Sequence, residues 1–164
     1  DGKRLNPSVY CLPMGIPTNN FVAEVVKFVQ APKEIIVMYE VDGTHRQIYT
    51  DGRPLSEDPT PAWLGYSTAK WEGDTLVVQS NGFNDKTWLD MNGHAHSESL
   101  LLTERYHRRS YGFMDVEMTF DDKTYYSKPF TIKFQAQLRP GEELMEYICT
   151  ENERDAKHLD NLKK

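Results

Sequence analysis

Short runs of alternating apolar and polar residues cover most of the chain, and this pattern predicts β-strands. The clearest run spans residues 34–41 and is rich in β-branched residues. Asp42-Gly43 follows it, a pair typical of a type I′ turn, and residues 44–50 return as the partner strand. The pattern therefore predicts a β-hairpin over residues 34–50.

Further strands are expected between turn signals along the rest of the chain. Together with the hairpin they make about nine, at residues 21–29, 66–71, 75–80, 97–108, 113–120, 128–138 and 143–149. Residues 1–20 contain three prolines and predict an irregular arm. Only residues 151–164 read as a helix, because Thr150 and Glu153 fit a capping box.

These elements predict an all-β fold in a single domain spanning residues 1–164. Strands joined mainly by tight turns favour an antiparallel meander, since no crossover helices are present for a parallel sheet. Such a sheet avoids exposed edges by closing, so we expect a lipocalin-like β-barrel. The alternative is a jelly roll of the cupin type. Both enclose an interior that can hold a ligand.

The composition narrows the class of partner. Of 164 residues, 38% are apolar and 27% charged, as in ordinary globular domains, and the net charge is −6. An acidic chain is a poor match for nucleic acid or an anionic membrane surface. No apolar run reaches the roughly 20 residues needed to span a bilayer. A small-molecule ligand is therefore the expected partner, and exposed edge strands would also permit a dimer.

Two cysteines, Cys11 and Cys149, lie near opposite ends of the chain and have no zinc-site spacing. They are either two buried thiols or one disulfide that ties the arm to the last strand. We favour the disulfide, and with it a periplasmic or secreted location, because disulfides persist in oxidising compartments.

The segment 88–98 holds the densest group of candidate site residues. It contains Trp88, Asp90, His94, His96 and Glu98. If the chain is extended after Gly93, the last three side chains point to the same side. A polar row of this kind suits a site better than an apolar core.

Three functions remain open for this group. The first is acid/base chemistry without a cofactor, of the lyase, hydratase, isomerase or cyclase type. His94 or His96 would carry the proton, Asp90 and Glu98 would assist, and Trp88 would form an apolar wall. The second is binding without catalysis. The third is a divalent transition metal on His94, His96 and Glu98, although a strand would spread them over about 13 Å. A plain surface turn is the alternative to all three.

Other polar residues are candidates for contacts with the ligand. His45 shares a strand face with Gln47, and Glu104 has the same strand parity as Glu98. The candidate ligand-binding residues, besides Trp88, are His45, Tyr49, Asp51, Arg53, Asp85 and Glu104.

Several motifs together resemble a family of exported proteins from soil bacteria. They are the run Trp71-Glu-Gly-Asp-Thr-Leu-Val-Val78, the run from Gly82 to Asp90, His96-Ser-Glu98 and Thr103-Glu-Arg-Tyr106. The resemblance covers roughly residues 34–150. It implies that the segment 88–98 belongs to a family pattern, and it implies no particular activity.

Overall fold

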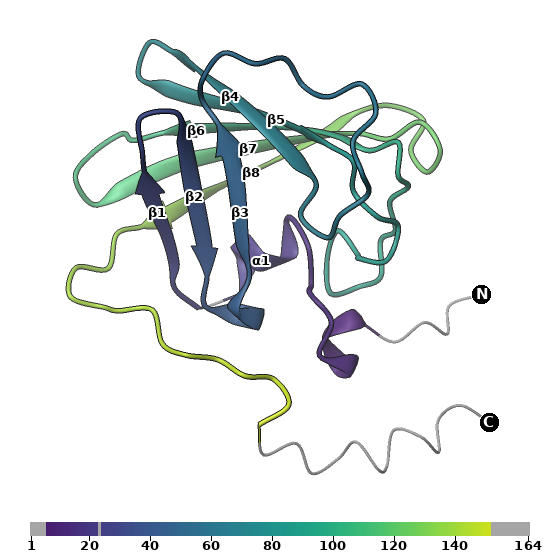
Figure 1. Ribbon diagram of the computed structural model, residues 1–164, viewed down its shortest axis with the longest axis horizontal. Helices are drawn as coiled ribbons and strands as arrows, with labels where there is room; N and C mark the ends of the chain where they lie inside the picture. The colour runs from purple at the N-terminus through teal and green to yellow at the C-terminus, as the bar shows by residue number, and fades with distance from the viewer. Residues whose placement is uncertain (1–5, 23, 152–164) are drawn as a thin grey trace.

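Eight β-strands form one sheet in which each strand pairs with its neighbours in sequence order (Figure 1). The computed structural model describes residues 6–22 and 24–151. The predicted all-β class is confirmed. The strands are Val26–Gln30 (β1), Glu34–Tyr39 (β2), His45–Tyr49 (β3), Tyr66–Glu72 (β4), Thr75–Asn81 (β5), Leu101–His107 (β6), Phe113–Asp121 (β7) and Phe130–Gln137 (β8).

Helical structure in the described residues is confined to single turns. They are the 3₁₀ turns Pro7–Tyr10 (η1) and Val41–Gly43 (η2) and the α-helical turn Thr18–Phe21 (α1). None of these is long and apolar enough to cross a membrane. The helix predicted for residues 151–164 lies outside the described residues from position 152 onward.

One strand pair is parallel, so the prediction of a purely antiparallel sheet is wrong. Ile48 and Tyr49 in β3 pair in parallel with Ser67 and Thr68 in β4, while all other neighbours are antiparallel. A parallel pair needs a connection long enough to return the chain to the same end of the sheet. The proline-rich segment 50–65 supplies that length without a helix.

Three predicted strand segments are not strands. Residues 143–149 form no strand. They run as an irregular strap along β2 and η2, and the Met145 amide donates to the Glu40 carboxylate (2.9 Å). Residues 97–100 are a turn, Phe21 is the last residue of α1, and β1 begins only at Val26. In the β2–β3 hairpin, Asp42 and Gly43 adopt the positive φ angles (61° and 56°) that a type I′ turn requires. The 3₁₀ turn η2 makes the loop longer than a two-residue turn.

The sheet curls until its first strand lies across its later ones. In Figure 1, β1–β3 cross in front of β6–β8, and the ring of Phe28 in β1 lies 5.6 Å from the ring of Tyr106 in β6. Among the described residues β1 and β8 do not pair with each other. The architecture is thus a half-barrel formed by one sheet, and the two facing sheets of a jelly roll are not formed.

An ion pair lies inside the half-barrel among the apolar core residues. Arg46 in β3 donates to both carboxylate oxygens of Glu104 in β6, and the two side chains are 1% and 0% exposed. Arg46 also donates to Ser67 (2.9 Å) and Ser80 (2.5 Å), and Tyr106 donates to Glu104 (2.6 Å). The network joins β3, β4, β5 and β6. Glu104, predicted as a ligand contact, is instead fully buried in this network and does not line the cavity described below.

The electrostatics of this network follow from its burial. Burial would lower the pKa of Arg46, but the charge and hydrogen bonds of Glu104 raise it, so the guanidinium stays charged. Burial, partly offset by Arg46, raises the pKa of Tyr39 to about 12. The interior therefore holds one fixed charge pair and neutral phenols.

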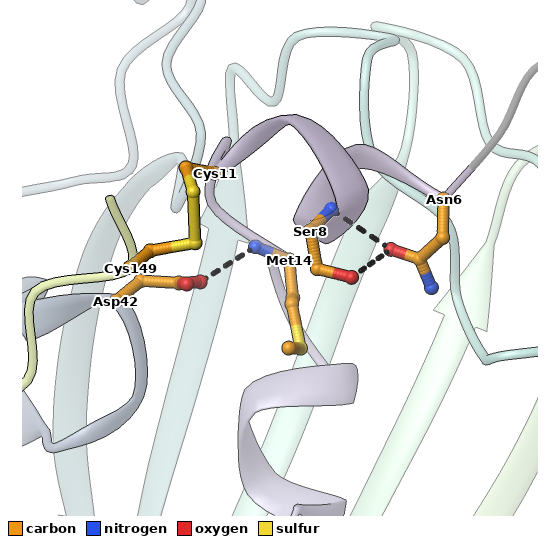
Figure 2. The surroundings of a disulfide bond; sticks show 6 residues. All are labelled: Asn6, Ser8, Cys11, Met14, Asp42 and Cys149. Carbon is orange, nitrogen blue, oxygen red and sulfur yellow. Dashed lines mark hydrogen bonds between the residues drawn. A yellow bond between two sulfur atoms is a disulfide. The ribbon is translucent and has the colours of Figure 1, made fainter. Parts of the chain in front are cut away.

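Cys11 and Cys149 form a disulfide, as predicted (Figure 2). It joins the N-terminal arm to the C-terminal strap across a sequence separation of 138 residues. Beside it, the Met14 amide donates to the Asp42 carboxylate (3.0 Å), which fixes the arm to the β2–β3 hairpin. The arm is thus anchored at two points before it reaches α1.

Candidate functional site

The segment 88–95 forms a tight hairpin rather than a strand of the sheet. Trp88 and Ala95 make an isolated antiparallel bridge, and the Leu89 amide donates to the carbonyl of His94 (2.7 Å). Gly93 has φ 89°, which an L side chain rarely adopts, and it lies against the Trp88 ring. The hairpin therefore turns at residues 90–93.

Asp90 organises this turn through its carboxylate. Oδ1 accepts from the backbone amides of Asn92 (2.9 Å) and His94 (3.3 Å), and Oδ2 accepts from Nδ1 of His94 (2.6 Å) and from the Asn92 amide nitrogen (3.4 Å). Partial burial raises the pKa of Asp90, but these hydrogen bonds outweigh burial and hold it below its usual value. Asp90 is an ionised carboxylate that fixes the His94 ring.

This contact determines which nitrogen of His94 is available. Because Nδ1 donates to Asp90, Nε2 of the neutral ring carries the lone pair. The imidazole is well exposed, at 64% of its side-chain surface. His94 and Asp90 thus form a hydrogen-bonded dyad in which the carboxylate orients the imidazole.

His96 lies only two residues further along but turns into the protein. It is 1% exposed, its ring meets the edge of Phe83, and Nδ1 donates to the Ser97 carbonyl (3.1 Å). In the neutral ring, Nε2 accepts from the hydroxyl of Thr87 (2.7 Å). Burial lowers the pKa of His96. Both ring nitrogens are satisfied internally, so His96 is a positioning residue.

Two contacts hold the hairpin against the turn between β7 and β8. Asp122 accepts from the amide (2.5 Å) and the hydroxyl (2.9 Å) of Ser97. The hydroxyl of Tyr126 donates to the Ala95 carbonyl (2.8 Å). The turn between β7 and β8 therefore holds in place the hairpin that carries the His94–Asp90 dyad.

The N-terminal arm closes the other side of the hairpin. The hydroxyl of Thr18 donates to the Trp88 carbonyl (3.2 Å). A Cβ atom at Gly15 would lie 2.7 Å from Cβ of Thr87. The arm is therefore in close contact with Thr87, the residue that holds the His96 ring. Any displacement of the arm is therefore expected to reach the hairpin.

A largely apolar cavity of about 480 Å³ opens beside the dyad. Cavities of roughly 300–1,000 Å³ are typical of small-molecule sites. Its walls come from the arm, the hairpin, β7, the β7–β8 turn and β8. The lining residues are Pro17, Phe21, Leu89, Asp90, His94, Phe120, Tyr126, Phe130 and Ile132.

The structure separates the residues of the predicted polar row. His94 is exposed at the cavity, His96 is buried away from it, and Glu98 is exposed in a turn. They do not share one face, because the segment is a hairpin and not a strand. Within residues 6–22 and 24–151, no three His, Cys, Asp or Glu side chains gather as a metal-ligand group. The predicted metal triad is therefore not formed.

Four of the remaining predicted ligand-binding residues lie in β3 or in the turn that follows it: His45, Tyr49, Asp51 and Arg53. His45 and Tyr49 lie on the outer face of β3 and not on its buried face, and His45 borders a hollow of about 200 Å³ under the C-terminal strap. In the following turn Arg53 pairs with Asp51 (2.6 Å) and stacks on Tyr49 (3.7 Å). None of the four lines the cavity beside His94.

Asp85 and Trp88 are closer in sequence to the dyad but are also absent from the cavity wall. Asp85 is exposed, and the half-buried Trp88 ring packs over Gly93. The apolar wall predicted for Trp88 is supplied instead by Phe21, Phe120 and Phe130.

Sequence reasoning missed the residues that shape the cavity. The strand predicted at residues 21–29 includes Phe21, and Asp122 and Tyr126 fall between the strands predicted at 113–120 and 128–138. The one signal was parity, because Phe120 continues the buried alternation of β7. Their meeting depends on how the sheet curls.

Comparison of the chain with protein-family models, with curated proteins and with solved structures found no match.

Proposed function

We propose that this protein binds a small, partly hydrophobic organic molecule in the cavity and moves a proton at Nε2 of His94. The carrying observation is the placement of the His94–Asp90 dyad at the rim of an apolar cavity. The reaction class is elimination, hydration, isomerisation or cyclisation without a cofactor, in which a positioned base suffices.

The roles of the residues follow from their contacts. Asp90 holds the ring and stabilises the imidazolium formed when Nε2 takes a proton, as an ionised carboxylate does for a paired histidine. Phe120 and Phe130 stack with centroids 5.0 Å apart and offer an apolar wall to the body of the substrate. His96 and Thr87 keep the hairpin in place.

A carbon-acid probe tests this proposal without knowledge of the natural substrate. We choose 5-nitrobenzisoxazole, a small neutral aromatic compound. A base removes the proton from C3, the electron pair forms the nitrile, and the N–O bond breaks to give a cyano-nitrophenolate. The histidine then returns its proton to water. Release of the coloured phenolate gives the rate.

We expect wild-type protein to accelerate this reaction and His94→Gln to lose most of the acceleration, since a positioned base contributes roughly 10²- to 10⁴-fold. Asp90→Asn should lower the rate without abolishing binding of the probe. His45→Gln is the matched control, because it removes an exposed histidine outside the cavity. Equal rates in wild type and His94→Gln would contradict catalysis.

A non-catalytic carrier is the alternative, and the cavity alone supports it. The same experiment separates the two functions. If N-phenyl-1-naphthylamine, a neutral fluorescent probe, binds to wild type and is excluded by Ile132→Trp while no carbon-acid activity is found, the protein is a carrier. If it does not bind, both forms of the proposal fail.

We further propose that the curled sheet holds its ligand on its inner face, as lipocalins do, and that the protein is exported. The cavity lies on the inner face of β7 and β8, as ligand sites do in barrels. The Cys11–Cys149 disulfide supports an oxidising compartment, either the periplasm or the cell exterior. Fractionation of cells that express the native gene tests the location.

A further inference from the structure

We infer that the occupant of the cavity is an uncharged ring compound that carries a hydroxyl or N–H group at the end next to His94. This inference rests on the proposed function and names the class of ligand for that site. It follows from three properties of the cavity wall: its charges, its free hydrogen-bonding atoms and the shapes of its aromatic rings.

The charges of the wall exclude an anionic group. Among residues 6–22 and 24–151 no lysine or arginine lines the cavity, and the charged group at its rim is the Asp90 carboxylate. A carboxylate, sulfate or phosphate on the ligand would lose water without gaining a cationic partner, and burial of an unpaired charge is costly. It would also lie close to a like charge.

The acceptors of Asp90 are already used within the protein. Each of its oxygens accepts two hydrogen bonds, from the Asn92 and His94 groups described above. Two oxygens offer about four lone-pair sites, so an ammonium on the ligand would find none free. The carboxylate therefore orients His94 and does not pair with a ligand cation.

His94 lines the cavity, and because its Nδ1 donates to Asp90, its Nε2 is left as an acceptor. Tyr126, the other polar group in the wall, already donates its hydroxyl to the Ala95 carbonyl. A ligand that complements this site must donate a hydrogen bond to Nε2. A neutral hydroxyl or N–H meets this need without a buried charge.

The apolar walls favour a flat body. Phe120 and Phe130 lie with an interplanar angle of 16°, and Tyr126 meets Phe130 edge-on at 5.0 Å. The three rings pack on one another in this way, and an aromatic cluster of this kind packs well against a further ring. The ligand is thus a planar, ring-bearing molecule with one donor group.

The test uses four compounds with the same naphthalene body: 2-naphthol, 2-methoxynaphthalene, 2-naphthoate and 2-naphthylmethylammonium. Calorimetry with the full chain at neutral pH gives each affinity. We expect 2-naphthol to bind about 2- to 10-fold more tightly than 2-methoxynaphthalene, the worth of one net hydrogen bond. The naphthoate and the ammonium should bind at least about tenfold more weakly than 2-naphthol.

Variants connect the ranking to the residues. His94→Leu should make the affinities for 2-naphthol and 2-methoxynaphthalene equal. Ile132→Trp should exclude all four compounds by filling the cavity, while Thr131→Trp, on the opposite face of β8, should not. Phe21→Ala, a milder change at a half-exposed wall residue, should weaken all four and is informative if Ile132→Trp does not fold.

The outcomes are distinguishable. If the compounds bind but naphthoate or the ammonium is tightest, or the hydroxyl gives no advantage in wild type, the inference is wrong and the proposed function stands. If none of the four binds, both fail. If sedimentation shows a dimer that 2-naphthol dissociates, the apolar wall is an interface between two copies, and the inference is overturned.

Discussion

Thr87 holds the ring of His96 through a hydrogen bond of 2.7 Å between Oγ1 and Nε2, and both residues are 1% exposed. The opposite ring nitrogen donates to the Ser97 carbonyl, and burial lowers the pKa of this histidine, which favours its neutral form. Two imidazoles two residues apart therefore have different roles: His94 is open at the cavity and His96 supports it.

Stability should fall on mild acidification because of His96. Burial lowers its pKa in the folded state, whereas the unfolded chain has the ordinary value near 6.5. Below about pH 6.5 the unfolded state binds more protons, so unfolding becomes easier until the pH passes below the folded pKa. We expect a slope of up to about 1.4 kcal/mol per pH unit in urea titrations between pH 7.5 and 5.

Carboxylates do not explain a loss in that range. The pKa of Asp122 is raised by burial but lowered further by hydrogen bonds from Ser97 and Thr124, so its stabilisation is lost only in stronger acid. His96→Gln should be less stable at pH 7.5 and should show a smaller slope. His45→Gln removes an exposed imidazole as the control. An unchanged slope in His96→Gln would assign the effect to another group.

Removal of one member of the buried ion pair should be costly. Arg46→Met leaves the Glu104 carboxylate buried without its cation, and we expect a loss of about 3–5 kcal/mol in urea unfolding. The double variant Arg46→Met/Glu104→Leu should recover much of this loss, because no unpaired charge remains.

An exposed ion pair on the outer face of the sheet is the control for this double-mutant comparison. Lys133 and Glu117 are 2.6 Å apart across β7 and β8 but are largely exposed. Exposed pairs contribute about 0–1 kcal/mol, so Lys133→Met should cost little. If the two cycles gave equal coupling energies, burial would not be the source of the effect at Arg46.

The disulfide should contribute strongly to stability because it closes a long loop. For a sequence separation of 138 residues, the chain-entropy model gives about 5 kcal/mol. Replacement of Cys11 and Cys149 together by serine should approach this loss and should remove any response of the unfolding midpoint to reductant. If the unfolding midpoint of the wild type were the same with and without reductant, the disulfide would not stabilise the fold.

A methyl group at Gly15 should disturb the site through Thr87. Gly15→Ala combines a positive φ of 78° with a Cβ contact of 2.7 Å, and we expect a loss of about 2–5 kcal/mol in the free energy of unfolding. Gly52→Ala has a similar φ of 86° but open space, so it should cost only about 1–2 kcal/mol. Equal losses would mean that backbone strain, not the contact with Thr87, dominates.

Only part of the candidate site could be predicted from the sequence. Asp90 and His94 were found because a carboxylate and an imidazole four residues apart around a glycine turn are a local feature. The ion pair of Glu104 could not be predicted, because parity along the chain does not show that Arg46, 58 positions away, lies opposite it. Phe21 and Tyr126 gave no signal, since they meet only across the arm and the sheet edge.

The sequence by itself determined most of the strands, the hairpin at Asp42-Gly43 and the pairing of the two cysteines, because alternation and turn chemistry act over a few residues and only two thiols were present. The tertiary structure decided the parallel β3–β4 pair, the half-barrel and the opposite directions of His94 and His96. These depend on contacts between residues far apart in sequence, whose packing no local pattern specifies.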